Sequence, residues 1–404
     1  MKREIVLYSF FLSVFVTGCF SDKTGQDGLP FIDVKKKYPE KEIILTDIAD
    51  VTYLHLSTVD DDYLYRGKIS CVTENTIVVV DNVSESILFF SKDGTPKSRI
   101  NRRGQGPEEY LGVLGMIYDE KADDVFVVTG MNTIKVYSST GMYKRKITLP
   151  QGMQILHPIV FDDHSLFFYD YFIDYYRGMA LLGGEDLPEV KKNILPFYRI
   201  SRTDGEVLDY VELPGTHLLM GVNYYGRWRS APRVYLSKCP DGVLLWSLET
   251  DTVFLYNGNE SLTPVIYQTP SVASQNPKEC LFLCLDRGQY QFIQVLLVRE
   301  GINIQGDISS IYDLFPPKYY MRNKKTGEVV HPKLLIPDYE GKEVSFGATS
   351  SLGLDIENGY YFELDLYELK EAYRENRLSG KLKELVSTLN ENEDNNVFVL
   401  IDFK

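Results

Sequence analysis

Short apolar runs dominate the chain from Ile43 onward. They are rich in Val, Ile, Tyr and Phe, and Gly, Asn and Asp separate them. Apolar runs of about four to eight residues, bounded by turn residues, are typical of β-strands. The sequence therefore predicts an all-β body over residues 43–404.

One strand-and-turn unit recurs along this body. In each copy an aromatic residue near the end of an apolar strand is followed by a glycine turn, and the glycines are 47 to 69 positions apart. Glycine supplies the positive φ that tight hairpins need. The turn glycines are Gly94, Gly141, Gly205, Gly258 and Gly327. A superperiod of about fifty residues, with several strands in each unit, predicts a β-propeller.

The repeat predicts six blades. We expect the innermost strands of the first five blades at 68–74, 111–118, 156–162 and 232–238, and from Glu279. The sixth blade should combine residues 346–354, 359–364 and 397–403 with residues 51–56 from the other end of the chain. Sharing a blade between the two ends closes the ring and removes an open sheet edge. A β-sandwich is the alternative fold, but sandwich strands recur without this superperiod.

Three segments interrupt the strand pattern. Residues 172–196 and 299–317 are interpreted as insertions in the third and fifth blades. Within residues 365–396, the leucines at 378, 382, 385 and 389 recur at helical spacing. We expect an amphipathic helical insertion over about 366–391, packed on the side of the propeller. A coiled-coil partner helix, the alternative, would need more heptads.

The N-terminus has the pattern of an export signal. Lys2 and Arg3 precede an apolar run that is too short to span about 30 Å of hydrocarbon, and Gly18 stands before Cys19. The pattern resembles a bacterial lipoprotein signal. That resemblance implies removal of residues 1–18 and a lipid anchor on Cys19, each buried methylene adding about 0.8 kcal/mol of membrane affinity. A cleaved secretory signal that happens to contain a cysteine is the alternative.

The anchor would place the protein at the cell envelope. Residues 19–42 are polar and are expected to form a flexible tether. We expect the protein to be anchored in the outer membrane, on either the periplasmic face or the cell surface. The membrane would be a partner through the lipid alone, because the formal net charge of −14 disfavours adhesion to anionic lipid and a nucleic-acid partner.

Metal and cofactor chemistry is not predicted. The histidines show no ligand spacing, and Cys71, Cys239, Cys280 and Cys284 are interpreted as buried thiols. The acidic turns at 60–62 and 119–124 lack the spacing of a calcium loop and are interpreted as solvated. No catalytic residue is assigned.

A distinctive motif lies between the first two blades. Residues 101–110 read NRRGQGPEEY. In this position the segment resembles the GxGPxEY signature of the six-bladed, NHL-like β-propeller lipoproteins of Bacteroidetes. Residues 44–56 also resemble the start of that family's domain. The resemblance covers about 43–403; it implies the propeller fold strongly and the activity hardly at all.

The motif has a structural interpretation. Gly104, Gly106 and Pro107 would fix a rigid bend between blades. Glu108 and Glu109 would accept hydrogen bonds from loop amides or pair with neighbouring arginines. On this interpretation these residues serve the turn itself.

The motif also has a functional interpretation. Arg102, Arg103 and Tyr110 would face the pore mouth and engage an anionic or glycan-like ligand. A second candidate binding loop is 224–229, in which Arg227, Trp228 and Arg229 combine an amphipathic ring with guanidinium groups. A packing role beneath blade four is the alternative for that loop.

Two classes of function follow. The first is a membrane-anchored, non-catalytic binding or scaffold propeller that recognises a protein, a peptide or a glycan. The alternative is a propeller enzyme, a lyase or glycosidase acting on polysaccharide or peptide, in which different blades aim histidines or carboxylates at the central channel.

Overall fold

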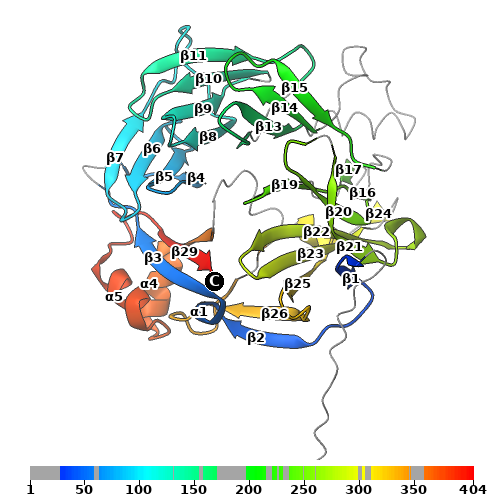
Figure 1. Ribbon diagram of the computed structural model, residues 1–404. Helices are drawn as coiled ribbons and strands as arrows, with labels where there is room; N and C mark the ends of the chain where they lie inside the picture. Colours follow the sequence, from blue (N-terminus) through cyan, green and yellow to red (C-terminus); the bar gives the residue numbers. More distant parts are fainter. Residues whose placement is uncertain are drawn as a thin grey trace, which may run out of the picture.

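The structure is a computed structural model of the whole chain. It describes residues 28–58, 63–130, 132–153, 158–170, 197–214, 221–224, 227–230, 236–248, 250–259, 261–298, 303–304, 311–344, 346 and 359–404. Six antiparallel sheets are arranged as radial blades of a ring (Figure 1). The predicted all-β, six-bladed propeller is confirmed.

Blades 1 to 3 are four-stranded, with strands in chain order from the centre outward. Blade 1 contains β4 (Gly67–Val72), β5 (Thr76–Asp81), β6 (Ile87–Ser91) and β7 (Pro96–Ile100). Blade 2 contains β8 (Gly115–Asp119), β9 (Asp124–Val128), β10 (Thr133–Tyr137) and β11 (Tyr143–Thr148). Blade 3 contains β12 (Ile159–Val160), β13 (Ser165–Tyr169), β14 (Phe197–Ser201) and β15 (Val207–Val211).

Blades 4 and 5 continue this order. Blade 4 contains β18 (Leu236–Cys239), β19 (Gly242–Leu245), β20 (Thr252–Tyr256) and β21 (Thr263–Thr269), and the short 3-10 helix η3 (Val272–Ser274) follows it. Blade 5 contains β22 (Lys278–Arg287), β23 (Tyr290–Val298), β25 (Pro317–Asn323) and β26 (Val329–Leu335), with β27 (Glu343–Val344) paired to β26. All the predicted innermost strands of blades 1 to 5 fall within or beside observed ones.

The two ends of the chain share blade 6. Its described strands are β28 (Gly359–Leu364), β29 (Val397–Phe403) and, from the N-terminal part, β3 (Ala49–His55). β3 pairs antiparallel with β29 over its whole length, so the ring closes as predicted. Of the further strand predicted at 346–354, only Phe346 lies within the described residues.

The repeated glycines lie in the turns between the two outermost strands of blades 1 to 5. Gly94, Gly141, Gly205, Gly258 and Gly327 all have positive φ, between 69° and 91°. A Cβ at Gly94 would overlap the carbonyl oxygen of His55 in the preceding blade, and one at Gly205 would lie 2.8 Å from Ile147 Cγ2. Glycine is needed there for both its backbone conformation and its small size.

The N-terminal segment is built into the propeller rim. β1 (Phe31–Asp33) pairs in parallel with β21, and β2 (Glu40–Ile44) pairs in parallel with β26. Helix α1 (Leu45–Ile48) then leads into β3, so this segment passes along blades 4, 5 and 6 (Figure 1). Ile32 is fully buried. The predicted flexible tether over 19–42 is therefore wrong for residues 31–42. Their polar composition indicated a flexible segment, but two strands within it pair with the outer strands of blades 4 and 5.

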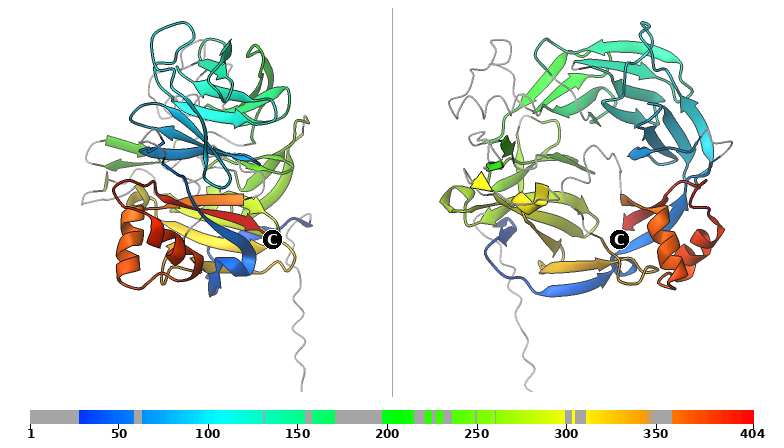
Figure 2. Two further views of the ribbon diagram at one scale, coloured as in Figure 1. Left: turned by 90° about the vertical axis from the view of Figure 1, so that its left-hand side faces the viewer. Right: turned by 180° about the vertical axis from the view of Figure 1, so that it is seen from behind.

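The insertion near the C-terminus is a pair of helices. α4 (Leu366–Arg374) and α5 (Gly380–Thr388) pack on the outer side of blade 6 (Figure 2). Asp365 caps α4 by accepting a 3.0 Å hydrogen bond from the Glu368 amide. Asn376, with φ of 56°, lies between the helices, so the single predicted helix is corrected to two. Leu382, one of the leucines at helical spacing, is fully buried, and so is Leu369 of α4.

A small sheet lies apart from the six blades, and the predicted insertion at 299–317 contributes one strand to it. The predicted insertion at 172–196 lies outside the described residues. β16 (Gly221–Tyr224) pairs with β17 (Arg227–Ser230) and with β24 (Asn303–Ile304), and α3 (Ile311–Leu314) lies just before β25. Elsewhere the core lies between neighbouring blades, with continuous apolar clusters across blades 1 and 2 and across blades 2 and 3. Cys71, Cys239, Cys280 and Cys284 are buried, as predicted.

Candidate functional site

The predicted motif forms a closed turn between β7 and β8. The Gly104 amide donates to the Tyr110 carbonyl at 3.0 Å, and the Tyr110 amide donates to the Arg102 carbonyl at 2.9 Å. Glu109 folds back into this turn, and its Oε2 accepts from the Gly106 amide at 2.8 Å. A Cβ at Gly104 would overlap the Glu109 carboxylate. These contacts support the structural interpretation of the glycines and of Glu109.

Tyr110 lies in the interface between blades 1 and 2. Its side chain is fully buried, and its hydroxyl donates to the Glu85 carbonyl at 2.8 Å. Burial raises the pKa of Tyr110. Its ring packs edge-to-face on Tyr137, whose hydroxyl donates to the Glu108 carbonyl at 2.9 Å. The residue predicted to touch a ligand thus holds the motif against both blades.

The predicted arginines are placed differently. Arg102 and Arg103 are exposed, and Arg102 Nε donates to the Gly141 carbonyl at 3.1 Å, in the outer hairpin of blade 2. Arg227, Trp228 and Arg229 form β17, and their side chains lie outside the described part of the structure. Ligand binding by all of these residues stays a prediction. Pro107 is exposed in the turn.

A pocket opens beside the motif turn. It has a volume of about 420 Å³ and is bounded by the turn on one side and by the β9–β10–β11 part of blade 2 on the other. Its lining includes Gly104, Gly106, Leu111, Thr133, Lys135 and Lys146. We call this cavity the motif pocket.

Two lysines of the motif pocket face each other across a strand pair. Lys135 of β10 and Lys146 of β11 are direct partners in the antiparallel register. Lys135 Nζ donates to the Glu109 carbonyl, while the Lys146 side chain is exposed. Burial and then repulsion by Lys146 lower the pKa of Lys135, against the opposing attraction of Glu109. Like charges directly opposite each other destabilise a sheet, so this pair is a local cost to the fold.

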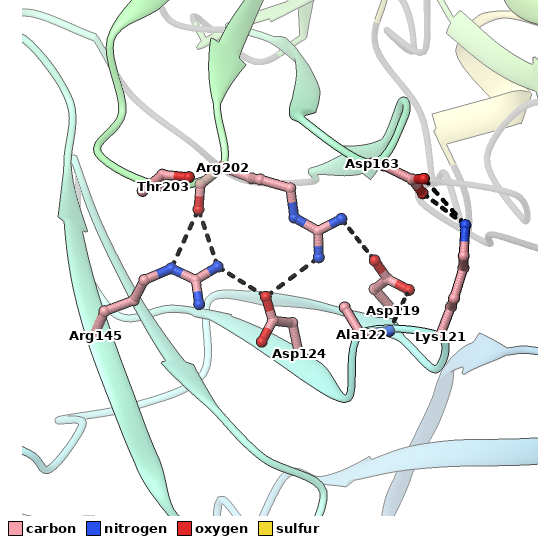
Figure 3. A pocket seen from close by; sticks show the side chains of 8 residues that line it. All are labelled: Asp119, Lys121, Ala122, Asp124, Arg145, Asp163, Arg202 and Thr203. Atoms are coloured by element: carbon pink, nitrogen blue, oxygen red, sulfur yellow. Dashed lines mark hydrogen bonds and ion pairs between the residues drawn. The ribbon is translucent and has the colours of Figure 1, made fainter.

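A second pocket lies at the other end of β9, between blades 2 and 3 (Figure 3). It has a volume of about 430 Å³, and its lining contains three aspartates and three basic side chains. The charged lining residues are Asp119, Asp124, Asp163, Lys121, Arg145 and Arg202. We call this cavity the inter-blade pocket.

The charges of the inter-blade pocket neutralise one another. Arg202 of blade 3, with a side chain only 7% exposed, reaches Asp119 Oδ2 at 2.6 Å and Asp124 Oδ2 at 3.2 Å. Arg145 Nη2 lies 2.8 Å from Asp124 Oδ2. Figure 3 marks this contact with a dashed line. The Arg202 guanidinium also covers the ring of Phe126, 5.1 Å from its centroid. This network ties blade 3 to blade 2.

The pKa of Asp124 reflects this pairing. Burial acts to raise it, but hydrogen bonds from Arg145 and Lys144 outweigh burial and lower the pKa below its usual range. Asp124 is only 6% exposed, so the prediction of a solvated turn at 119–124 is wrong for this residue. The sequence carries no signal for the network, because Arg202 is 78 positions from Asp124.

Possible catalytic or metal-binding groups are spread over different blades. Within the described residues, no three His, Cys, Asp or Glu side chains are grouped so as to hold a metal ion. His55, His164 and His331 lie in or beside strands of blades 6, 3 and 5. The described part of the chain also contains no helix of the length and apolarity required to cross a membrane.

The closed ring of radial sheets defines the class as a six-bladed β-propeller. The chain belongs to a family described as a domain of unknown function, DUF4934, whose model matches residues 29–402. No curated protein matches the sequence. The family model begins within the segment that had been predicted as a tether, in accord with its place on the propeller rim.

Two solved structures from Bacteroides are among those to which the chain is similar. BF0058 of Bacteroides fragilis, a protein classed as exported, has a TM-score of 0.61 at 14% identity, covering 93% of this chain and 99% of its own. A member of the DUF4221 family from Bacteroides vulgatus has a TM-score of 0.48 at 11% identity, covering 88% and 97%. At this identity the likeness to BF0058 shows a shared fold.

Proposed function

We propose that this protein is a non-catalytic binding or scaffold module that holds a protein, peptide or glycan ligand in the motif pocket. The observation that carries the proposal is the pocket itself. Its volume of about 420 Å³ is in the range of ligand sites, and two mutually repelling lysines line it. An acidic group of a ligand between them would relieve the repulsion that the fold leaves in place.

The ligand-binding test compares two pockets on the same blade. Thr133→Tyr would fill the motif pocket, and Thr203→Tyr would introduce the same side chain at the inter-blade pocket. The full chain, purified in detergent, would be tested on glycan arrays and against fractionated envelope proteins. We expect saturable binding that Thr133→Tyr abolishes and Thr203→Tyr preserves. Binding that survives Thr133→Tyr would overturn the assignment of the site.

The proposal includes a lipid anchor on Cys19 at the cell envelope, on the outer membrane. The signal pattern before Cys19 supports it, and so does the classification of BF0058, a protein of the same fold, as an exported protein. Membership among the NHL-like propeller lipoproteins is part of this proposal. Labelled palmitate should be incorporated into the chain, and Cys19→Ala should abolish labelling and release the protein from membranes. Unchanged membrane retention in Cys19→Ala would refute the anchor.

The rival proposal of a propeller enzyme has a separate readout. The same preparation would be incubated with envelope and plant polysaccharides and with peptides, and new reducing ends, unsaturated products or free amines would be measured. Turnover that follows protein concentration would replace the binding proposal with the lyase, glycosidase or peptidase that matches the product.

A further inference from the structure

The motif pocket has an apolar margin. Leu111 and Leu114, in the connection from the motif to β8, are 67% and 52% exposed. Val83, in the turn between β5 and β6, is 65% exposed. The Val113 amide donates to Glu85 Oε2 at 2.9 Å, which holds that connection beside the β5–β6 turn. Leu111 lines the motif pocket together with the two lysines, and Leu114 follows it in the same connection.

The charge of this region differs from that of the whole protein. The chain carries a formal net charge of −14. In the motif pocket, Lys135 and Lys146 face one carboxylate, and Glu109 is already committed to the Gly106 amide. The Lys135 ammonium donates to the backbone carbonyls of Glu109 and Gly106. A local basic site on an acidic protein is complementary to an acidic group of a ligand.

The lining also bears on the class of ligand. Sugar rings commonly pack flat on aromatic side chains, whereas the described lining of the motif pocket is aliphatic, polar and basic. Aliphatic side chains beside two cations are complementary to a chain that carries carboxylates and apolar groups in close succession. A polypeptide meets that description better than a glycan does.

We infer that the motif pocket and its apolar margin bind an acidic polypeptide segment of a partner protein. One carboxylate of the segment lies between Lys135 and Lys146, and an adjacent apolar side chain packs on Leu111 and Leu114. This inference rests on the proposed binding function and names the ligand class of the same site. The lysine pair that weakens the isolated sheet becomes a recognition element once the carboxylate is in place.

The test uses a displayed library of random peptides selected on the full chain in detergent. We expect enriched peptides to place Asp or Glu next to an aliphatic residue. Binding of synthetic versions would be measured by fluorescence anisotropy. Lys146→Glu should weaken binding at least tenfold, whereas Lys121→Glu, the same change at the exposed edge of the inter-blade pocket, should leave it unchanged.

A charge swap separates recognition from a merely structural effect. A peptide in which the key Asp or Glu is replaced by Lys should bind Lys146→Glu more tightly than it binds the natural protein. Peptides enriched without acidic residues, or equal binding to both proteins, would overturn the inference while leaving a binding function intact. Lys146-dependent binding of uronic-acid glycans instead of peptides would also overturn it. A lack of saturable binding to any peptide or glycan would count against both proposals.

Discussion

The two pockets at the ends of β9 are similar in size and both contain charged side chains. In the inter-blade pocket each buried carboxylate faces a guanidinium, so that Arg202 serves both Asp119 and Asp124. In the motif pocket the directly opposed residues are two lysines. The comparison teaches that the abundance of charge does not identify a binding site. Compensated charges tie blades together, and uncompensated charges are available to a ligand.

The largest effect is expected from breaking the inter-blade network. Arg202→Met removes a cation that is 7% exposed and leaves Asp119 and Asp124 with fewer partners. Removing one partner of a buried ion pair costs about 3 kcal/mol or more. Urea unfolding of the full chain should show this loss. Lys121→Met, which breaks only an exposed contact with Asp163, should cause no measurable change and serves as the control.

Acid should weaken the same network. Because the folded state lowers the pKa of Asp124, this carboxylate stabilises the fold above its unfolded pKa of about 4. That contribution is lost as the pH falls through the lower folded pKa. The difference in unfolding free energy between the natural protein and Asp124→Asn should therefore shrink on acidification, as urea titrations at a series of pH values would show. A constant difference would contradict the assigned pairing.

A smaller effect is expected at the support of the motif pocket. Tyr110→Phe removes a buried hydroxyl that donates to the Glu85 carbonyl at 2.8 Å. Loss of one such hydrogen bond should destabilise the fold by about 1 kcal/mol. Peptide affinity, measured under conditions where the variant is folded, should be unchanged, because the side chain is buried and does not line the pocket. A loss of affinity without a loss of stability would assign Tyr110 to recognition after all.

The smallest expected effect is a gain in folding stability instead of a loss. Lys146→Glu replaces an opposed like-charge pair with an opposite-charge pair, which should stabilise the protein by about 0.5 kcal/mol. Burial and then repulsion by Lys146 lower the pKa of Lys135 in the folded state. Keeping Lys135 charged therefore costs folding stability at neutral pH, and this cost is relieved as the pH rises through the folded pKa of Lys135. The gain in stability should accordingly fade at high pH. Urea unfolding at neutral and alkaline pH would measure both effects, and a destabilised Lys146→Glu would contradict the interpretation of the pair.

Sequence periodicity predicted the fold because each blade is a local unit. The aromatic strand ends and the turn glycines at 94, 141, 205, 258 and 327 recur in blades 1 to 5, and all five glycines have the expected positive φ. The shared blade was also predictable, since the C-terminal part of the chain left the sixth blade one strand short and residues 51–56 could supply that strand. Helical leucine spacing located the insertion, although the break at Asn376 was not foreseen.

The candidate site was only partly predictable. The motif at 101–110 indicated where the pocket lies, but Tyr110 proved to be a packing residue and Lys135 and Lys146 were not foreseen. Their opposition depends on the register of β10 against β11, and a shift of one residue would send one of them to the other face of the sheet.

By itself, the sequence determined the strands, the turns and the number of blades, because these depend on backbone conformations and apolar patterns within a few dozen residues. The tertiary structure alone decided the rim strands β1 and β2, the Arg202 network and the lysine pair. Each of these depends on which distant segment lies opposite, at a distance of a few ångströms, and no local pattern of residues encodes that.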